Sequence, residues 1–263
     1  DALAKAGTSA AGVTGITAAS LSTDVTSPNV IVGAIIGAAV VFFFAGLLIN
    51  AVARAAGAVV YEVRRQFREI VGIMEGTALP EYGKVVDIVT RDSLRELATP
   101  GLMAVLAPIA TGFALGVGAL AGYLVGAIAA GALMAVFLAN SGGAWDNAKK
   151  LVEEGNHGGK GSPAHEATII GDTVGDPFKD TAGPAINPLL KVMNLVALLI
   201  APLIVRYSVG IHHNAPLRII IALVAFAIIV VSVVISKRRS VAVGGDDAGD
   251  AGGAPAAPST LTI

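Results

Sequence analysis

Long runs without a charged residue dominate this sequence. No Asp, Glu, Lys or Arg occurs in Val25–Ala53, Leu97–Trp145 or Ile219–Ser236. A helix that crosses a bilayer needs about 20 mostly apolar residues, so the first and last runs each suit one span and the middle run suits two. A further helix is expected at about 167–206, where Val192–Val205 carries no charged residue. The runs predict an all-α fold, a polytopic transmembrane helix bundle of about five membrane-spanning helices.

The composition excludes several classes of soluble protein. Charged residues make up only 14% of the chain, whereas soluble domains usually carry about 25%. The formal net charge of −1 leaves no basic surplus, so no nucleic-acid partner is expected. The absence of cysteine excludes disulfides, thiolate zinc sites and cysteine nucleophiles. The expected surrounding of this chain is therefore a lipid bilayer.

The two ends of the chain differ from the apolar middle. Residues 28–239 hold all the predicted spans. Residues 1–27 are rich in Ala, Gly, Ser and Thr and lack the basic stretch and apolar core of a signal peptide, so an extracytoplasmic loop is expected there. Residues 240–263 are rich in Gly, Ala, Pro and Asp and predict a disordered cytoplasmic tail. The chain begins with Asp1 and is expected to be the carboxyl-terminal part of a longer protein.

Lysine and arginine gather in three of the segments that flank the predicted spans. They lie between the first and second spans, between the third and fourth, and after the fifth. Spans that alternate in direction bring these three segments to one side of the membrane, and the positive-inside rule makes that side the cytoplasm. The turn at residues 116–118 and a loop that contains His212 and His213 are then expected outside.

A line of polar residues runs along the helix predicted at about 167–206. At about 100° per residue, Asp172, Asp176 and Asp180 follow one face of that helix, and Lys179 lies within the same stripe. Like charges at this spacing repel one another, and near a membrane they are costly to bury. One lysine does not neutralise three aspartates. The stripe therefore predicts a bound cation, and oxygen ligands without His or Cys favour Mg²⁺.

Two further groups accompany this stripe. Asp146 and Lys149 end the preceding predicted helix, at the membrane face where Asp172 is expected. Asn187 and Lys191 extend the stripe toward membrane depth. Opposed carboxylates and lysines fit a metal–phosphate complex. Charged helix ends are also common where helices simply meet water, so the spacing alone leaves both explanations open.

Two motifs connect these residues with a known family. Gly143-Ala144-Trp145-Asp146-Asn147-Ala148-Lys149-Lys150 and Gly171–Thr181 with Gly183-Pro184 closely resemble segments of the membrane-bound, ion-pumping pyrophosphatases. Glu62–Phe67 and Ile73–Gly76 match the same family, and the resemblance covers roughly residues 25–206. It implies that this chain holds the last helices of the family fold, with an extra span at 217–236. It also implies a homodimer in a bacterial cell membrane.

The resemblance further implies an activity and the residues that carry it. Members of this family hydrolyse pyrophosphate with Mg²⁺ on the cytoplasmic side and export H⁺ or Na⁺. By position, the residues that look like Mg²⁺ ligands are Asp146, Asp172 and Asp176, with Asp180 beside them. Those that look like pyrophosphate ligands are Lys149 and Lys179, and Lys179 also looks catalytic.

Three positions are similar to the water-holding group and the ion path of the family. Asp180 matches the aspartate that helps to hold the attacking water and that begins the ion path. Lys191 matches the lysine of the ion gate, and Asn187 lies between the two. The residues that select H⁺ or Na⁺ and set K⁺ dependence lie, in the family, on helices outside this chain.

Two other functions are compatible with the same residues. The aspartate stripe could line a divalent-cation channel or carrier. The chain could also be a non-catalytic assembly subunit, because the resemblance places the other half of the site on helices that it lacks. The isolated 263 residues are expected to be inactive.

Overall fold

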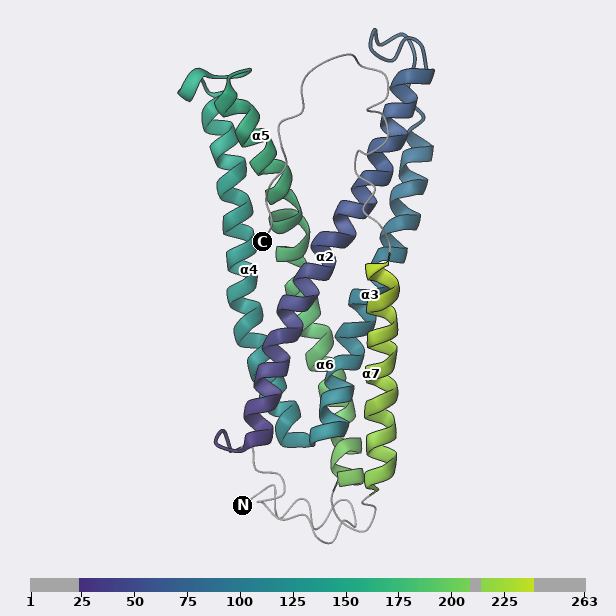
Figure 1. The fold of residues 1–263 in the computed structure, drawn as a ribbon, viewed down its shortest axis with the longest axis vertical. Helices are drawn as coiled ribbons and strands as arrows, with labels where there is room; N and C mark the ends of the chain where they lie inside the picture. The colour runs from purple at the N-terminus through teal and green to yellow at the C-terminus, as the bar shows by residue number, and fades with distance from the viewer. Residues whose placement is uncertain (1–23, 209–213, 239–263) are drawn as a thin grey trace, which may run out of the picture.

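The computed structural model describes residues 24–208 and 214–238, which form a bundle of helices without any β-strand in these two stretches (Figure 1). The elements are α2 (Pro28–Glu69), α3 (Tyr82–Leu115), α4 (Val117–Glu153), η2 (Asn156–Gly158), α5 (Pro163–Asp176), η3 (Pro177–Ala182), α6 (Gly183–Ser208) and α7 (Ala215–Lys237). With α5, η3 and α6 taken as one rod, five helices in the described part are long and apolar enough to cross a membrane. The predicted all-α polytopic bundle is confirmed, and the chain is a multi-pass integral membrane protein.

The basic connections gather at one end of the bundle. In Figure 1 the α2–α3 and α4–α5 connections lie at the top, and the turn at Gly116 lies at the bottom. Helix α7 ends at mid-height, well below the tops of α2 and α4. This arrangement agrees with spans that alternate in direction. That the charged end faces the cytoplasm stays a prediction. Most of the predicted outer loop, the loop residues 209–213 and the tail lie outside the described residues.

Helix α3 differs from the sequence-based expectation. Residues 81–96 alternate apolar and charged residues with helical spacing, which predicts a short surface helix there and a separate span from 97. Instead, α3 is continuous from Tyr82 to Leu115 and contains Pro100 and Pro108. A proline removes one backbone hydrogen bond, and the loss is tolerated where neighbouring helices hold the chain in place. Helices α2 and α7 pack along α3 and supply this support.

Polar side chains attach α7 to its neighbours at the level where it ends. Arg54 of α2 binds the carboxylate of Glu96 of α3 at 2.5 Å and donates to the Ser236 hydroxyl of α7 at 3.2 Å. One turn deeper, the hydroxyls of Ser232 and Thr99 are 3.0 Å apart. These contacts fix the predicted extra span against α2 and α3.

Small residues bring α2 and α4 into backbone contact. A Cβ atom added to Gly122 or Gly126 of α4 would overlap the carbonyl oxygens of Val30 and Ala34 of α2. Gly33 of α2 meets the backbone of α4 in the same way. Glycine at every fourth position allows this close approach between membrane helices. The Gly122 and Gly126 repeat therefore serves packing, as the sequence predicted.

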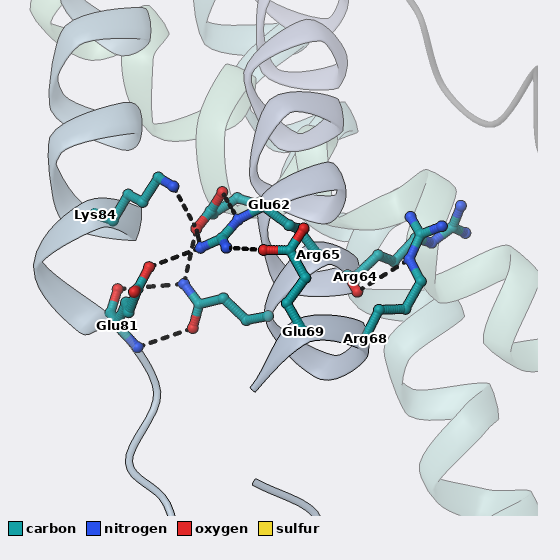
Figure 2. Close-up of polar contacts among 8 residues, drawn as sticks. Glu62, Arg64, Arg65, Arg68, Glu69, Glu81 and Lys84 are labelled. Carbon is teal, nitrogen blue, oxygen red and sulfur yellow. Dashed lines mark hydrogen bonds and ion pairs between the residues drawn. The ribbon is translucent and has the colours of Figure 1, made fainter. Parts of the chain in front are cut away.

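Beyond the apolar span, a partly buried network ties α2 to the start of α3. Figure 2 shows Arg65 at its centre, donating to Glu62 at 2.7 Å and to Glu81 at 2.7 Å. The Gln66 amide also donates to Glu62 at 3.0 Å, and both Glu62 and Gln66 are buried. Arg64 and Arg68 lie on the other side of the helix in the same view. The network holds the two extensions together at the charged end.

Candidate functional site

The polar line predicted from the sequence lies on one continuous rod that packs against α4. Ser162 caps the start of α5, where its hydroxyl accepts a hydrogen bond from the backbone N–H of His165. The Trp145 ring of α4 lies over Gly171 and Gly175 of α5. Its centroid is 5.8 Å from that of Phe178. This tight contact brings the charged ends of α4 and α5 together.

The middle of the rod is a π-helix rather than an α-helix. The segment Pro177–Ala182 has the wider π turn, and the backbone N–H of Gly183 bonds the carbonyl oxygen of Phe178, five residues earlier. Pro177 and Pro184 have no N–H to donate, so α-helical bonds are missing on both sides of this segment. π turns of this kind occur frequently at functional sites. The prediction of regular α-helical spacing is therefore wrong across 177–182.

Lys179 lies at the centre of a cluster of carboxylates. Its Nζ atom is 2.9 Å from Asp146 of α4, 2.9 Å from Asp176 and 3.3 Å from Asp172. Asp172 is buried and also pairs with Lys149 of α4. The structure thus joins five of the predicted site residues, drawn from two helices, in one network.

A sixth residue completes the cluster and changes its charge balance. Lys150 binds Asp146 at 3.0 Å, and its position four residues after Asp146 was the sequence signal for this pair. With Lys149, Lys150 and Lys179 present, the carboxylates of Asp146, Asp172 and Asp176 are paired with lysines. Asp180, the third aspartate of the predicted stripe, has no ion pair in the described part of the chain, so the expected bound cation stays a prediction. The expectation of Mg²⁺ then depends on the family resemblance and on the chemistry of the ligands.

The donor chemistry of the cluster nevertheless fits Mg²⁺. Three carboxylates converge on a single cation, the Lys179 ammonium. Within the described residues, no group of three carboxylate or imidazole side chains is arranged to hold one metal ion. Mg²⁺ in proteins typically binds one or two carboxylates and completes its shell with water and substrate phosphates. Two of the three aspartates around Lys179 would supply the carboxylates of such a Mg²⁺ site.

The remaining predicted residues lie apart from this cluster. Asp180, Asn187 and Lys191 are all exposed, and none of them forms an ion pair or side-chain hydrogen bond with another described residue. They lie on the face of the rod away from the residues that α6 buries, such as Ile186 and Met193. The structure therefore places the predicted ion path on one open face and the charge cluster on the α4 side.

The contact between Gly142 and the rod should be essential for the cluster. A Cβ at Gly142 would lie 2.6 Å from the Gly175 carbonyl oxygen and 2.8 Å from the Lys179 Cβ, whereas one at Gly143 would meet nothing within 4 Å. We expect Gly142→Ala to cost about 1–3 kcal/mol of stability, as overpacking does. Gly143→Ala should be neutral or slightly stabilising. Thermal unfolding midpoints in detergent compare the two variants, and equal midpoints would contradict this account of the packing.

Comparison with known proteins identifies the family of this chain. A sequence model of the inorganic H⁺ pyrophosphatase family matches residues 3–200. A K⁺-insensitive pyrophosphate-energized proton pump of Streptomyces coelicolor is 70% identical over 88% of the chain and 29% of its own length. The pump of the same name from Streptomyces avermitilis is 73% identical over 85% of the chain and 28% of its length.

A more distant relative is named as a pump for a different ion. A putative K⁺-stimulated pyrophosphate-energized sodium pump of Bacteroides thetaiotaomicron is 55% identical over 70% of the chain and 26% of its length. The chain thus spans less than a third of the length of these relatives. The comparisons give no support to a divalent-cation channel. By the family match and by these identities, the chain belongs to the inorganic H⁺ pyrophosphatase family.

Proposed function

We propose that this chain is part of a membrane pump that hydrolyses pyrophosphate to two phosphates and uses the reaction to export H⁺ or Na⁺. The observation that carries the proposal is the Lys179 cluster in a chain of this family. The two Streptomyces relatives are named proton pumps, which favours H⁺. Such a pump would act as a homodimer in the cell membrane, with the charged end of the bundle in the cytoplasm.

The lysines of the cluster provide the binding chemistry for pyrophosphate. Lys149 and Lys179 already bind carboxylates, and phosphate oxygens are equally good acceptors for an ammonium group. When bound, Mg²⁺ would be held by pairs of carboxylates from Asp146, Asp172 and Asp176 and would withdraw negative charge from the phosphate oxygens. Lys179 would exchange part of its carboxylate contacts for the substrate. The site would then neutralise the charge that develops on the leaving phosphate.

Asp180 is suited to prepare the attacking water. It lies next to Lys179 in the π-helical segment, yet its carboxylate is exposed and free of ion pairs within the described residues. A carboxylate that no lysine holds can accept a proton from water as the oxygen attacks phosphorus. The proton released at Asp180 would lie at the upper end of the open face that carries Asn187 and Lys191. Hydrolysis and ion transfer would therefore both use residues of the rod formed by α5, η3 and α6.

Sealed vesicles that contain the complete protein test this proposal. Phosphate release from pyrophosphate and acidification or Na⁺ uptake are measured in parallel, with and without Mg²⁺. We expect Mg²⁺-dependent phosphate release accompanied by ion uptake, and no phosphate release by the isolated 263-residue chain. Divalent-cation flux without phosphate release would instead favour a channel or carrier.

A further inference from the structure

We propose that Asn194 is a further residue of the ion path, below Lys191 and at greater membrane depth. This inference rests on the proposed function. Asn194 lies within Val192–Val205, an otherwise apolar part of α6. It provides the last polar group on this face of α6, since Leu198 and Val205 follow it there.

Helical geometry places Asn194 on the same face as the two predicted path residues. It lies three residues after Lys191 and seven after Asn187, so all three fall within a sector of about 60°. All three are exposed. The residues that α6 buries against the described helices, among them Ile186, Met193 and Ala197, lie outside this sector. The path face of α6 therefore carries polar groups at three successive levels.

The side-chain amide of Asn194 lacks a partner where one is needed. It forms no side-chain hydrogen bond with any described residue. Asn50, which also lies in a membrane span, donates to the carbonyl oxygen of Gly46 in its own helix at 2.9 Å. An unsatisfied polar group at membrane depth is costly and marks an ion or water pathway, or a contact between helices. The side-chain amide of Asn194 is therefore free to bind an ion or water, whereas that of Asn50 already has a partner in its own helix.

The sequence below Asn194 explains why it would be the last polar group. In the same sector the next residues toward the end of α6 are Leu198, Ala201 and Val205. An amide oxygen can coordinate Na⁺ or accept a hydrogen bond from a hydrated proton, and an amide N–H₂ can bind the accompanying water. Asn194 would hold the ion after it leaves Lys191, while the apolar residues below keep the path closed to water.

Paired measurements of hydrolysis and transport test this role. In vesicles of the complete protein, Asn194→Leu and Asn194→Ala should hydrolyse pyrophosphate at a rate within about threefold of the wild type, because the change lies far from the cluster. The number of ions moved per phosphate released should fall by about three- to tenfold, the range that the loss of one intramembrane hydrogen bond supports. Asn194→Gln, which keeps the amide, should retain most of the transport. Asn50→Leu, the matched control, should leave this ratio unchanged.

The outcomes separate this inference from the proposed function. A wild-type protein that neither hydrolyses pyrophosphate nor moves ions would overturn the proposed function. A normal ion-to-phosphate ratio in either apolar variant would overturn the role of Asn194 alone. A loss of hydrolysis and transport in equal proportion in both apolar variants would show that Asn194 is only a packing contact, and would also overturn the role. Expressing transport per phosphate released removes differences in expression between variants.

Discussion

Replacing Lys179 by methionine in the complete protein should lower phosphate release from pyrophosphate by about a hundred- to a thousandfold, as the loss of one charged group at a phosphoryl-transfer site does. Methionine keeps the length of the side chain and removes its charge. The variant loses the ammonium that binds Asp146, Asp172 and Asp176 together, and with it the expected contact to the substrate. Release of phosphate from pyrophosphate by purified protein measures the effect.

A second lysine provides the control for this experiment. Lys160 lies in the connection between α4 and α5 and is exposed. Lys160→Met makes the same change of charge outside the cluster, and its activity should stay within about twofold of the wild type. Activity of Lys179→Met at the level of Lys160→Met would show that the cluster only joins α4 to α5.

Asp180→Asn should abolish hydrolysis while leaving the fold intact. Loss of the base that accepts the proton from water should cost about a hundred- to ten-thousandfold in phosphate release. Asp180 is exposed and without an ion pair in the described part of the chain, so its neutralisation should change stability by no more than about 0.5 kcal/mol. The two readouts are the rate of phosphate release and the thermal unfolding midpoint of the purified protein.

Glu166 offers a matched acidic control on the same rod. It lies in the first turn of α5 and is exposed. Glu166→Gln removes one negative charge without touching the cluster, and it should retain both activity and stability. If Asp180→Asn were as active as Glu166→Gln, the role of Asp180 as the water-holding group would be refuted.

The helices were predictable because a helix that crosses the hydrocarbon interior of a bilayer needs about 20 mostly apolar residues. The run from Val25 to Ala53 determines where α2 crosses, and the polar extension beyond it was visible as a charged helix that reaches Glu69. The continuity of α3 was not predictable. Pro100 and Pro108 interrupt the local pattern, and the helix continues through them because neighbouring helices, chiefly α2 and α7, pack against it. Local sequence carries no direct signal of such support.

The site shows the same division between local and tertiary information. The family motifs identified all five members of the network, and the structure joins them: Asp146, Lys149, Asp172, Asp176 and Lys179. The charge argument for a cation compared the aspartate stripe with Lys179 of its own helix, and the structure adds Lys149 and Lys150 of α4 as partners of Asp172 and Asp146. The sequence placed Lys149 near Asp172, but the pairing of Lys150 with Asp146 was overlooked. The π turn was also missed, since it follows from how Pro177 and Pro184 limit backbone bonding together.

The central claim is that the Lys179 cluster binds pyrophosphate, and an equilibrium titration tests it most directly. Methylene diphosphonate, a pyrophosphate analogue that cannot be hydrolysed at its bridge, is titrated in Mg²⁺ into the complete protein and its variants. The account predicts that Lys160→Met binds the analogue like the wild type, while Lys179→Met loses at least about tenfold in affinity. Unchanged affinity in Lys179→Met would contradict it.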